Sequence, residues 1–142
     1  MTEIVFYTFA DSPIDVARRV AGKAFSQGKQ VMIYAPDPVM ADSVDRLLWT
    51  TPALGFVPHC RDTDMLAAET PVLIGANPDA LKSADVIINL HHEQPPAFAR
   101  FERLIEIIDQ TDSGREQGRE RYRFYQSRGY ALQSHDMRKH AG

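Results

Sequence analysis

Short apolar runs alternate with segments of helical periodicity along this chain, and this alternation constrains its fold more than any other feature. Runs rich in β-branched and aromatic residues predict strands at 4–9, 30–35, 72–75 and 86–90. Apolar residues recur at helical spacing over 13–27 and 37–49. Strands that alternate with helices of this length build right-handed βαβ units. The sequence therefore predicts an α/β fold with a mainly parallel or mixed central sheet and helices on both faces.

The ends of the first two helices carry capping signals. Ser12 can cap a helix that begins at Pro13, and Gly28 is suited to end it. Pro38 opens the second helix in the same way. These residues predict where the connections between strands begin and end.

The segment 98–108 fits two structures. Phe98, Phe101, Ile105 and Ile108 have helical spacing, whereas the run LIEII at 104–108 suits a strand. We favour a strand at 104–108.

Size, charge and cysteine content limit the class of protein. The 142 residues fit one domain, 1–142, without internal repeats or a linker-like composition. A formal net charge of −3 disfavours a general polyanion binder. Cys60 is the single cysteine, which favours a reducing compartment, and no signal-peptide pattern or apolar run near the ~20 residues of a membrane span occurs. We therefore expect a cytoplasmic protein without a membrane partner.

Nucleotide binding is the first function to test against an α/β sequence. In the segment GKAFSQGKQ, five residues separate Gly22 from Gly28, and Gln30 follows Lys29, whereas a phosphate-binding loop has four intervening residues and a Ser or Thr after the lysine. The segment also precedes a strand instead of following one, and no G-x-G-x-x-G occurs. We expect a helix C-terminus here, in a Rossmann-like fold without a phosphate loop. A nucleotide-binding enzyme with a degenerate phosphate loop is the alternative.

Two histidine-containing segments raise metal or acid–base chemistry. His91-His92-Glu93 follows a predicted strand, where α/β proteins often place ligands. Adjacent side chains on an extended backbone point apart, so we expect a solvated loop and no shared metal. His59 and Cys60 are neighbours without a third orienting residue, which disfavours a thiol–base pair. We expect no metal, no cofactor and no catalytic centre, so that the chain itself is not an enzyme.

An arginine-rich segment over 115–128, bounded by Gly129, predicts the last helix. It holds five arginines and two glutamates, a local charge of +3. At 100° per residue, an arc of roughly 100° gathers Arg115, Arg119, Tyr122, Arg123 and Gln126. This face is either a solvated surface with Arg–Glu pairs or a pocket for an acidic ligand with an apolar end. Arginine binds carboxylates bidentately and tyrosine supplies an apolar wall, which suits the second interpretation.

A second cluster follows the helix at 37–49. The only tryptophan, Trp49, is followed by Pro52 and Phe56 in a proline-punctuated stretch. Such residues either belong to the core or anchor a protein interface, because Trp and Phe are common interface anchors and proline-rich loops usually run on the surface.

Taken together, these motifs resemble the chi subunit family of bacterial DNA polymerase III over essentially the whole chain. The matching blocks are F-Y (Phe6-Tyr7), G-K-x-V (Gly28, Lys29, Val31), D-x-L-W-x-x-P-x-x-x-F-V-P-H (Asp45, Leu47 to Trp49, Pro52, Phe56 to His59), V-I-I-N-L (Val86 to Leu90) and R-E-R-Y-x-x-Y-x-x-x-G-Y (Arg119 to Tyr122, Tyr125, Gly129, Tyr130).

The resemblance implies a non-catalytic accessory subunit of the polymerase clamp loader. It implies that Arg115, Arg119, Tyr122 and Arg123 bind the acidic C-terminal tail of single-stranded-DNA-binding protein, whose last residue is phenylalanine. The family has an arginine four residues after Tyr122, where this chain has Gln126.

The resemblance further implies that Trp49, Pro52 and Phe56 bind the psi subunit of the clamp loader, or another partner such as a helicase. DNA would then be contacted only indirectly. Direct binding of single-stranded DNA by the same arginines and Tyr122 is a further alternative, which the acidic net charge disfavours.

Overall fold

The computed structural model describes residues 1–50 and 56–140, and its strands form a single sheet of seven. In chain order the strands are β1 (Glu3–Ala10), β2 (Val31–Tyr34), β3 (His59–Arg61), β4 (Val72–Gly75), β5 (Val86–Asn89), β6 (Arg103–Asp109) and β7 (Leu132–Asp136). Their order across the sheet is β3-β4-β2-β5-β6-β1-β7. Every ladder between these described strands is parallel, which confirms the predicted α/β fold.

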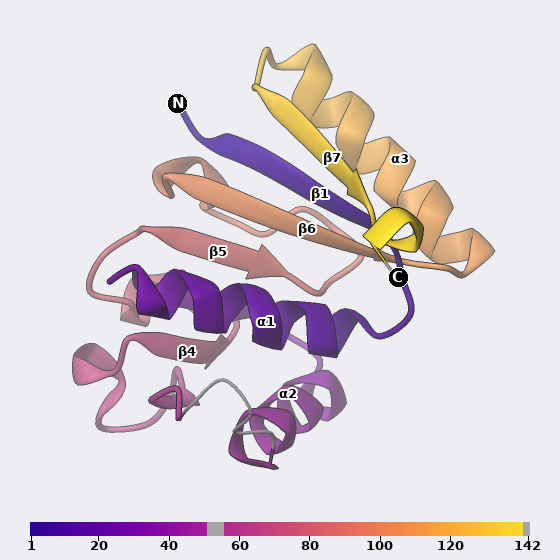
Figure 1. Ribbon diagram of the computed structural model, residues 1–142. Helices are drawn as coiled ribbons and strands as arrows, with labels where there is room; N and C mark the ends of the chain where they lie inside the picture. The colour runs from indigo at the N-terminus through magenta and orange to yellow at the C-terminus, as the bar shows by residue number, and fades with distance from the viewer. Residues whose placement is uncertain (51–55, 141–142) are drawn as a thin grey trace.

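Three α-helices, α1 (Pro13–Ser26), α2 (Pro38–Thr50) and α3 (Asp112–Ser127), cover the sheet within the described residues. Figure 1 shows α1 and α2 on one face, while α3 packs on the other face. Short 3₁₀ turns complete the connections: η2 (Ala67–Glu69), η3 (Pro78–Ala80), η4 (Phe98–Arg100) and η5 (Met137–His140). None of the helices in the described part of the chain has both the length and the apolarity that crossing a bilayer requires.

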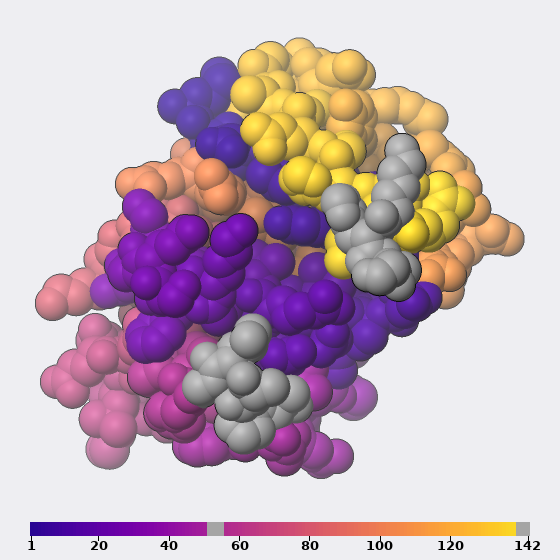
Figure 2. Space-filling model, viewed as in Figure 1, coloured from indigo at the N-terminus to yellow at the C-terminus, as the bar shows by residue number. Residues whose placement is uncertain are grey.

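The two faces of the sheet carry separate apolar cores, because successive side chains of a strand point to opposite faces. Val5, Val31 and Ile33 pack under α1 and α2, whereas Phe6 and Met32 pack on the side of α3. Figure 2 shows the face with α1 and α2, where the indigo β1 and the yellow β7 are visible beside α1.

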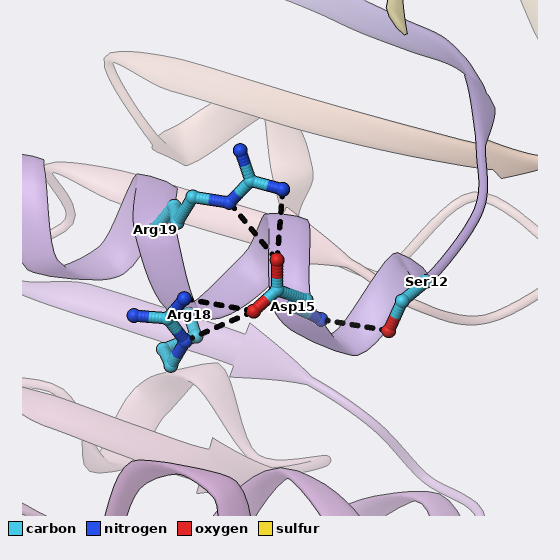
Figure 3. A network of polar contacts seen from close by, with 4 residues as sticks. All are labelled: Ser12, Asp15, Arg18 and Arg19. Atoms are coloured by element: carbon cyan, nitrogen blue, oxygen red, sulfur yellow. Dashed lines mark hydrogen bonds and ion pairs between the residues drawn. The ribbon is translucent and has the colours of Figure 1, made fainter. Parts of the chain in front are cut away.

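The first turn of α1 confirms the predicted cap. The Ser12 hydroxyl accepts a hydrogen bond from the Asp15 N–H at 3.3 Å, and the Asp15 carboxylate receives Arg18 and Arg19, each at 2.8 Å (Figure 3). The hydrogen bond from Arg18 lowers the pKa of Asp15 below its usual value despite partial burial. An ionised acid in the first turn also interacts favourably with the helix dipole. Gly28, at φ 78°, ends the helix as predicted.

Strand β6 confirms the strand predicted at 104–108, while β3 and β7 were not predicted. Both lie at edges of the sheet, and β7 is largely polar, so neither shows the apolar pattern that marks the central strands. The last helix begins at Asp112 instead of 115, because the Thr111 hydroxyl caps it by accepting from the Gly114 N–H at 3.0 Å.

Candidate functional site

A cavity of about 300 Å³ opens between α3, β1 and β7. Arg115, Arg119 and Tyr122 from the predicted helix face line it. The remaining lining residues come from the sheet and from the inner side of α3: Phe6, Thr8, Phe9, Ile108, Gly118 and Ser134. The lining of the cavity thus combines guanidinium groups with aromatic rings.

Phe9, near the end of β1, lies close to two guanidiniums. The Cζ of Arg115 lies 4.9 Å from the centre of its ring, and the Cζ of Arg138 lies 3.5 Å from it. Both distances are within the range of cation–π attraction. The φ of Phe9 is 57°, a left-handed conformation that is uncommon for a bulky residue. The fold therefore holds Phe9 in a strained backbone conformation beside this cavity.

The aromatic wall and the depth of the cavity come from close packing of α3 on the sheet. The ring of Tyr122 meets that of Phe6 edge to face, with centres 5.3 Å apart. Gly118 is buried against Ile108, and a Cβ at this position would lie 2.8 Å from Ile108 Cδ1. Any other residue here would force the Ile108 side chain to shift, so glycine favours the close approach of α3 to β6.

The structure separates the predicted arginines into two groups. Arg115 and Arg119 line the cavity, whereas Arg123 and Gln126 are exposed and do not line it. Arg121 is buried, 5% exposed, and therefore contributes nothing to the exposed positive charge. The basic character of the cavity therefore depends on fewer helix residues than the helical projection indicated. Arg138 of η5 adds a guanidinium beside Phe9.

Arg119 also forms one of the Arg–Glu pairs expected of a solvated face. Its Nη2 lies 2.6 Å from Glu116 Oε2, and this hydrogen bond lowers the pKa of the Glu116 carboxyl. Both side chains are about half exposed, so Arg119 can readily exchange Glu116 for another anion.

Trp49 and Phe56 form an exposed aromatic pair on the other side of the molecule, at the end of α2. Their side chains are 59% and 60% exposed, and their ring centres lie 5.6 Å apart. The core interpretation of these two residues is therefore wrong. The ring of His59 packs against that of Trp49, with ring centres 4.8 Å apart. Its Nδ1 faces Val57 O, and its Nε2 faces the Asp45 carboxylate. Pro52 lies outside the described residues.

A buried polar network lies beneath α3 and was not predicted from the sequence. The Glu106 carboxylate is fully buried and receives Arg121 Nε at 3.1 Å, the Tyr125 hydroxyl at 2.6 Å and Asn89 Nδ2 at 2.9 Å. Burial raises the pKa of Glu106, an effect that the neighbouring Arg121 charge opposes. The network ties α3 to the centre of the sheet. Its signal in the sequence was a single acid within the apolar run LIEII.

The expectation that His91 and His92 point apart is wrong. The chain bends after β5, so that the two ring centres lie 4.1 Å apart. Nitrogen and oxygen ligand atoms of His91, His92 and Glu93 all lie within 4.8 Å of one another, a spacing that could hold a metal ion. Burial, and then repulsion from His92, lowers the pKa of His91.

The segment that approached a phosphate-binding loop is the C-terminus of α1, as predicted. Lys29 directs its Nζ to Glu102 Oε2 at 3.5 Å. The segment precedes β2 and so lies at the opposite end of the strands from a nucleotide-binding turn.

Comparison with known proteins identifies the family. The family model described as "DNA polymerase III chi subunit, HolC" matches residues 1–133. The DNA polymerase III subunit chi of Pseudomonas aeruginosa is 32% identical over 141 residues, which cover 96% of this chain and 98% of that protein. The proteins of the same name from Haemophilus influenzae and Escherichia coli are 27% and 30% identical, over 87% and 80% of this chain and 86% and 78% of their own lengths.

Among solved structures, the helicase domain of Pyrococcus furiosus Hef has a similar fold, with a TM-score of 0.55. The match covers 82% of this chain but 28% of the Hef chain, at 12% identity, so it shows a shared fold alone. The match to the family model spans both the Trp49–Phe56 pair and α3, and the three relatives from Pseudomonas, Haemophilus and Escherichia carry the same name. The chain therefore belongs to the chi subunit family of DNA polymerase III.

Proposed function

We propose that this protein is a non-catalytic, cytoplasmic accessory subunit of the clamp loader that binds the acidic C-terminal tail of single-stranded-DNA-binding protein. The cavity beside α3 is the observation that carries the proposal. Its guanidiniums, Arg115 and Arg119, suit the acidic residues and terminal carboxylate of such a tail. Its aromatic wall at Phe6 and Tyr122 suits a terminal phenylalanine ring.

The dimensions of the cavity favour a short ligand segment over an extended surface. About 300 Å³ is enough for one aromatic side chain and a few polar groups. The exposed arginines Arg123 and Arg128 lie outside the cavity lining and would act on more distant acids of the tail through longer-range attraction.

A synthetic peptide with several aspartates and a C-terminal Asp-Phe should bind the protein, as measured by calorimetry. Because exposed charges contribute much of the affinity, the dissociation constant should rise several-fold between about 50 and 300 mM salt. Amidating the C-terminus or replacing the terminal Phe by Ala should each weaken binding by about tenfold or more.

Equal affinity for the parent peptide, the amidated peptide and the peptide ending in Ala would contradict this function, because it would indicate non-specific attraction between charges. Comparing intact with tail-less single-stranded-DNA-binding protein on coated DNA separates the adaptor function from direct DNA binding, because direct binding would not need the tail.

We also propose that Trp49 and Phe56 bind the psi subunit and so connect the protein to the clamp loader. Large aromatic side chains are rarely left more than half exposed without a partner, and they dominate protein interfaces energetically. The pair lies on the end of α2, away from the cavity on the face covered by α3, so both partners could bind at once.

Replacing Trp49 by Ala should weaken psi binding by about 30-fold, the loss typical of an aromatic interface anchor. The thermal midpoint of the isolated protein should change little, because the side chain is 59% exposed. The matched control is Val39→Ala, at the other end of α2, where an apolar side chain is 73% exposed. A loss of psi binding in the Val39 variant equal to that in the Trp49 variant would contradict the proposed interface.

A further inference from the structure

The connections of two neighbouring strands diverge at the middle of the sheet. β2 continues through α2 to β3 at one edge, whereas β5 continues to its neighbour β6 in the opposite direction. Strands that are adjacent and leave in opposite directions open a crevice at their carboxyl ends, which is where open α/β sheets most often bind ligands. The tail-binding cavity and the Trp49–Phe56 pair both lie elsewhere, so this crevice is unused by the proposed function.

Three potential metal ligands occupy this position, directly after β5. The Nε2 of His92 lies 3.5 Å from Glu93 Oε1, and the ligand atoms of His91, His92 and Glu93 lie within 4.8 Å of one another. In a tetrahedral zinc site with bonds of about 2.0–2.1 Å, ligand atoms are about 3.3 Å apart. The pair His92–Glu93 already has nearly this spacing, and because no two of the ligand atoms are more than 4.8 Å apart, the third ligand needs to move by at most roughly 1.5 Å, which a change of side-chain torsion provides.

Buried side chains hold the backbone of this loop in place. Asn89, which is fully buried, accepts a hydrogen bond from the His91 N–H at 2.9 Å and donates one to the Glu93 carbonyl at 2.9 Å. Arg121 donates to the carbonyl of His92. The backbone of all three residues is therefore anchored to the network around Glu106, so little ordering of the loop is needed when an ion binds.

The charges and the space around the loop are also compatible with a cation. The positive charge of Arg121 is compensated by Glu106 at 3.1 Å. A cavity of about 380 Å³ beside His92 and Glu93 is also lined by Glu120, which adds a second carboxylate near the ligands. This cavity leaves room for water to complete the coordination of a bound ion.

We propose that His91, His92 and Glu93 form a binding site for one divalent transition-metal ion of the zinc class. Two imidazoles and a carboxylate are the donors that zinc accepts, and three protein ligands leave one position open to water or to a partner's side chain. Asn89 acts as a positioning residue, since it holds both ends of the ligand loop.

Calorimetric titration of the tag-free, EDTA-treated full chain with ZnCl₂ tests the site. We expect one ion per chain with a dissociation constant in the micromolar range, and a thermal midpoint that rises by several degrees at saturating zinc. In an NMR titration, the imidazole signals of His91 and His92 should shift together up to one equivalent. His92→Ala should weaken binding by at least about tenfold, as should Glu93→Gln, which keeps the shape of the side chain.

The matched control is His135→Ala, which removes a histidine on β7 that stacks on Tyr7 at 5.3 Å. Its zinc affinity should equal that of the wild type. The proposal is overturned if the wild type takes up no zinc at 1 mM, or if the His92 and Glu93 variants bind as tightly as the control. His92 is 54% exposed and Glu93 73% exposed, so both variants should fold, and circular dichroism checks that they do.

Discussion

Replacing Arg121 by Ala should lower the free energy of unfolding by about 3–5 kcal/mol at pH 7, as measured by urea denaturation. The wild-type guanidinium is 5% exposed and donates to a carboxylate that is fully buried. Without it, Glu106 keeps only the neutral donors Tyr125 and Asn89, and an uncompensated charge remains in the core. The variant also loses the hydrogen bond to His92 O.

The loss in the Arg121 variant should depend on pH in a defined direction. Burial already raises the folded-state pKa of Glu106 above its usual value of 4.5, and removal of Arg121 raises it further. Between the unfolded and folded pKa values, the folded chain holds a proton that the unfolded chain releases, so stability falls as the pH rises through this interval. The difference from wild type should therefore be largest at neutral pH and shrink toward pH 4.5.

The double variant Glu106→Gln with Arg121→Met is the control for this interpretation. It removes the isolated charge and fills the same space, so it should be at least about 1–2 kcal/mol more stable than Arg121→Ala at pH 7. A single-variant loss below about 1 kcal/mol would show that the buried pair does not stabilise the fold, and a loss that is constant from pH 7 to pH 4.5 would show that the charge of Glu106 is not its cause.

Replacing Arg119 by Glu should weaken binding of the acidic tail peptide by about 100-fold, which corresponds to about 2.8 kcal/mol. Arg119 lines the cavity and is half exposed, so the change places a negative charge where the peptide's carboxylates would lie. The substitution also leaves the Glu116 carboxylate without its arginine partner, which would add repulsion toward the ligand. The circular dichroism spectrum should be unchanged, because the side chain makes no buried contact that the fold depends on.

Two charge-matched variants make this test specific to the cavity. Arg123→Glu changes the same helix outside the cavity lining. It should weaken binding of the peptide by about threefold to tenfold, which is less than the loss expected for Arg119→Glu. Arg46→Glu, on α2 at the other face of the sheet, should leave the affinity for the peptide nearly unchanged. Equal losses in all three variants would indicate that net charge alone governs the binding, and the cavity would then have no role.

The sequence could be used to predict the central part of the fold because the central strands are buried on both faces. Val31–Tyr34, Val72–Gly75 and Val86–Asn89 are buried throughout, and they are apolar except for Asn89 at the end of β5. The edge strands β3 and β7 have no such requirement, and their short or polar sequences carried no signal. A parallel edge strand forms where its neighbour offers a ladder, which is a property of the assembled sheet.

For the candidate site, helical periodicity placed Arg115, Arg119 and Tyr122 on one face, and the structure brings all three to one cavity. Periodicity could not supply Phe9 or Ser134, which come from strands more than a hundred residues apart in the chain. It also could not show that Arg121 turns inward, because its partner Glu106 lies on another element.

The sequence by itself determined the alternation of the central strands and helices, the cap of α1 and the family, since these depend on neighbouring residues and on motif spacing. Only the tertiary structure decided which charges are compensated and which remain available to a ligand. Arg119 and Arg121 are two residues apart on one helix, yet one is half exposed beside a cavity and the other is paired in the core. The physical reason is that charge pairing and desolvation depend on distances across the fold, which no local pattern encodes.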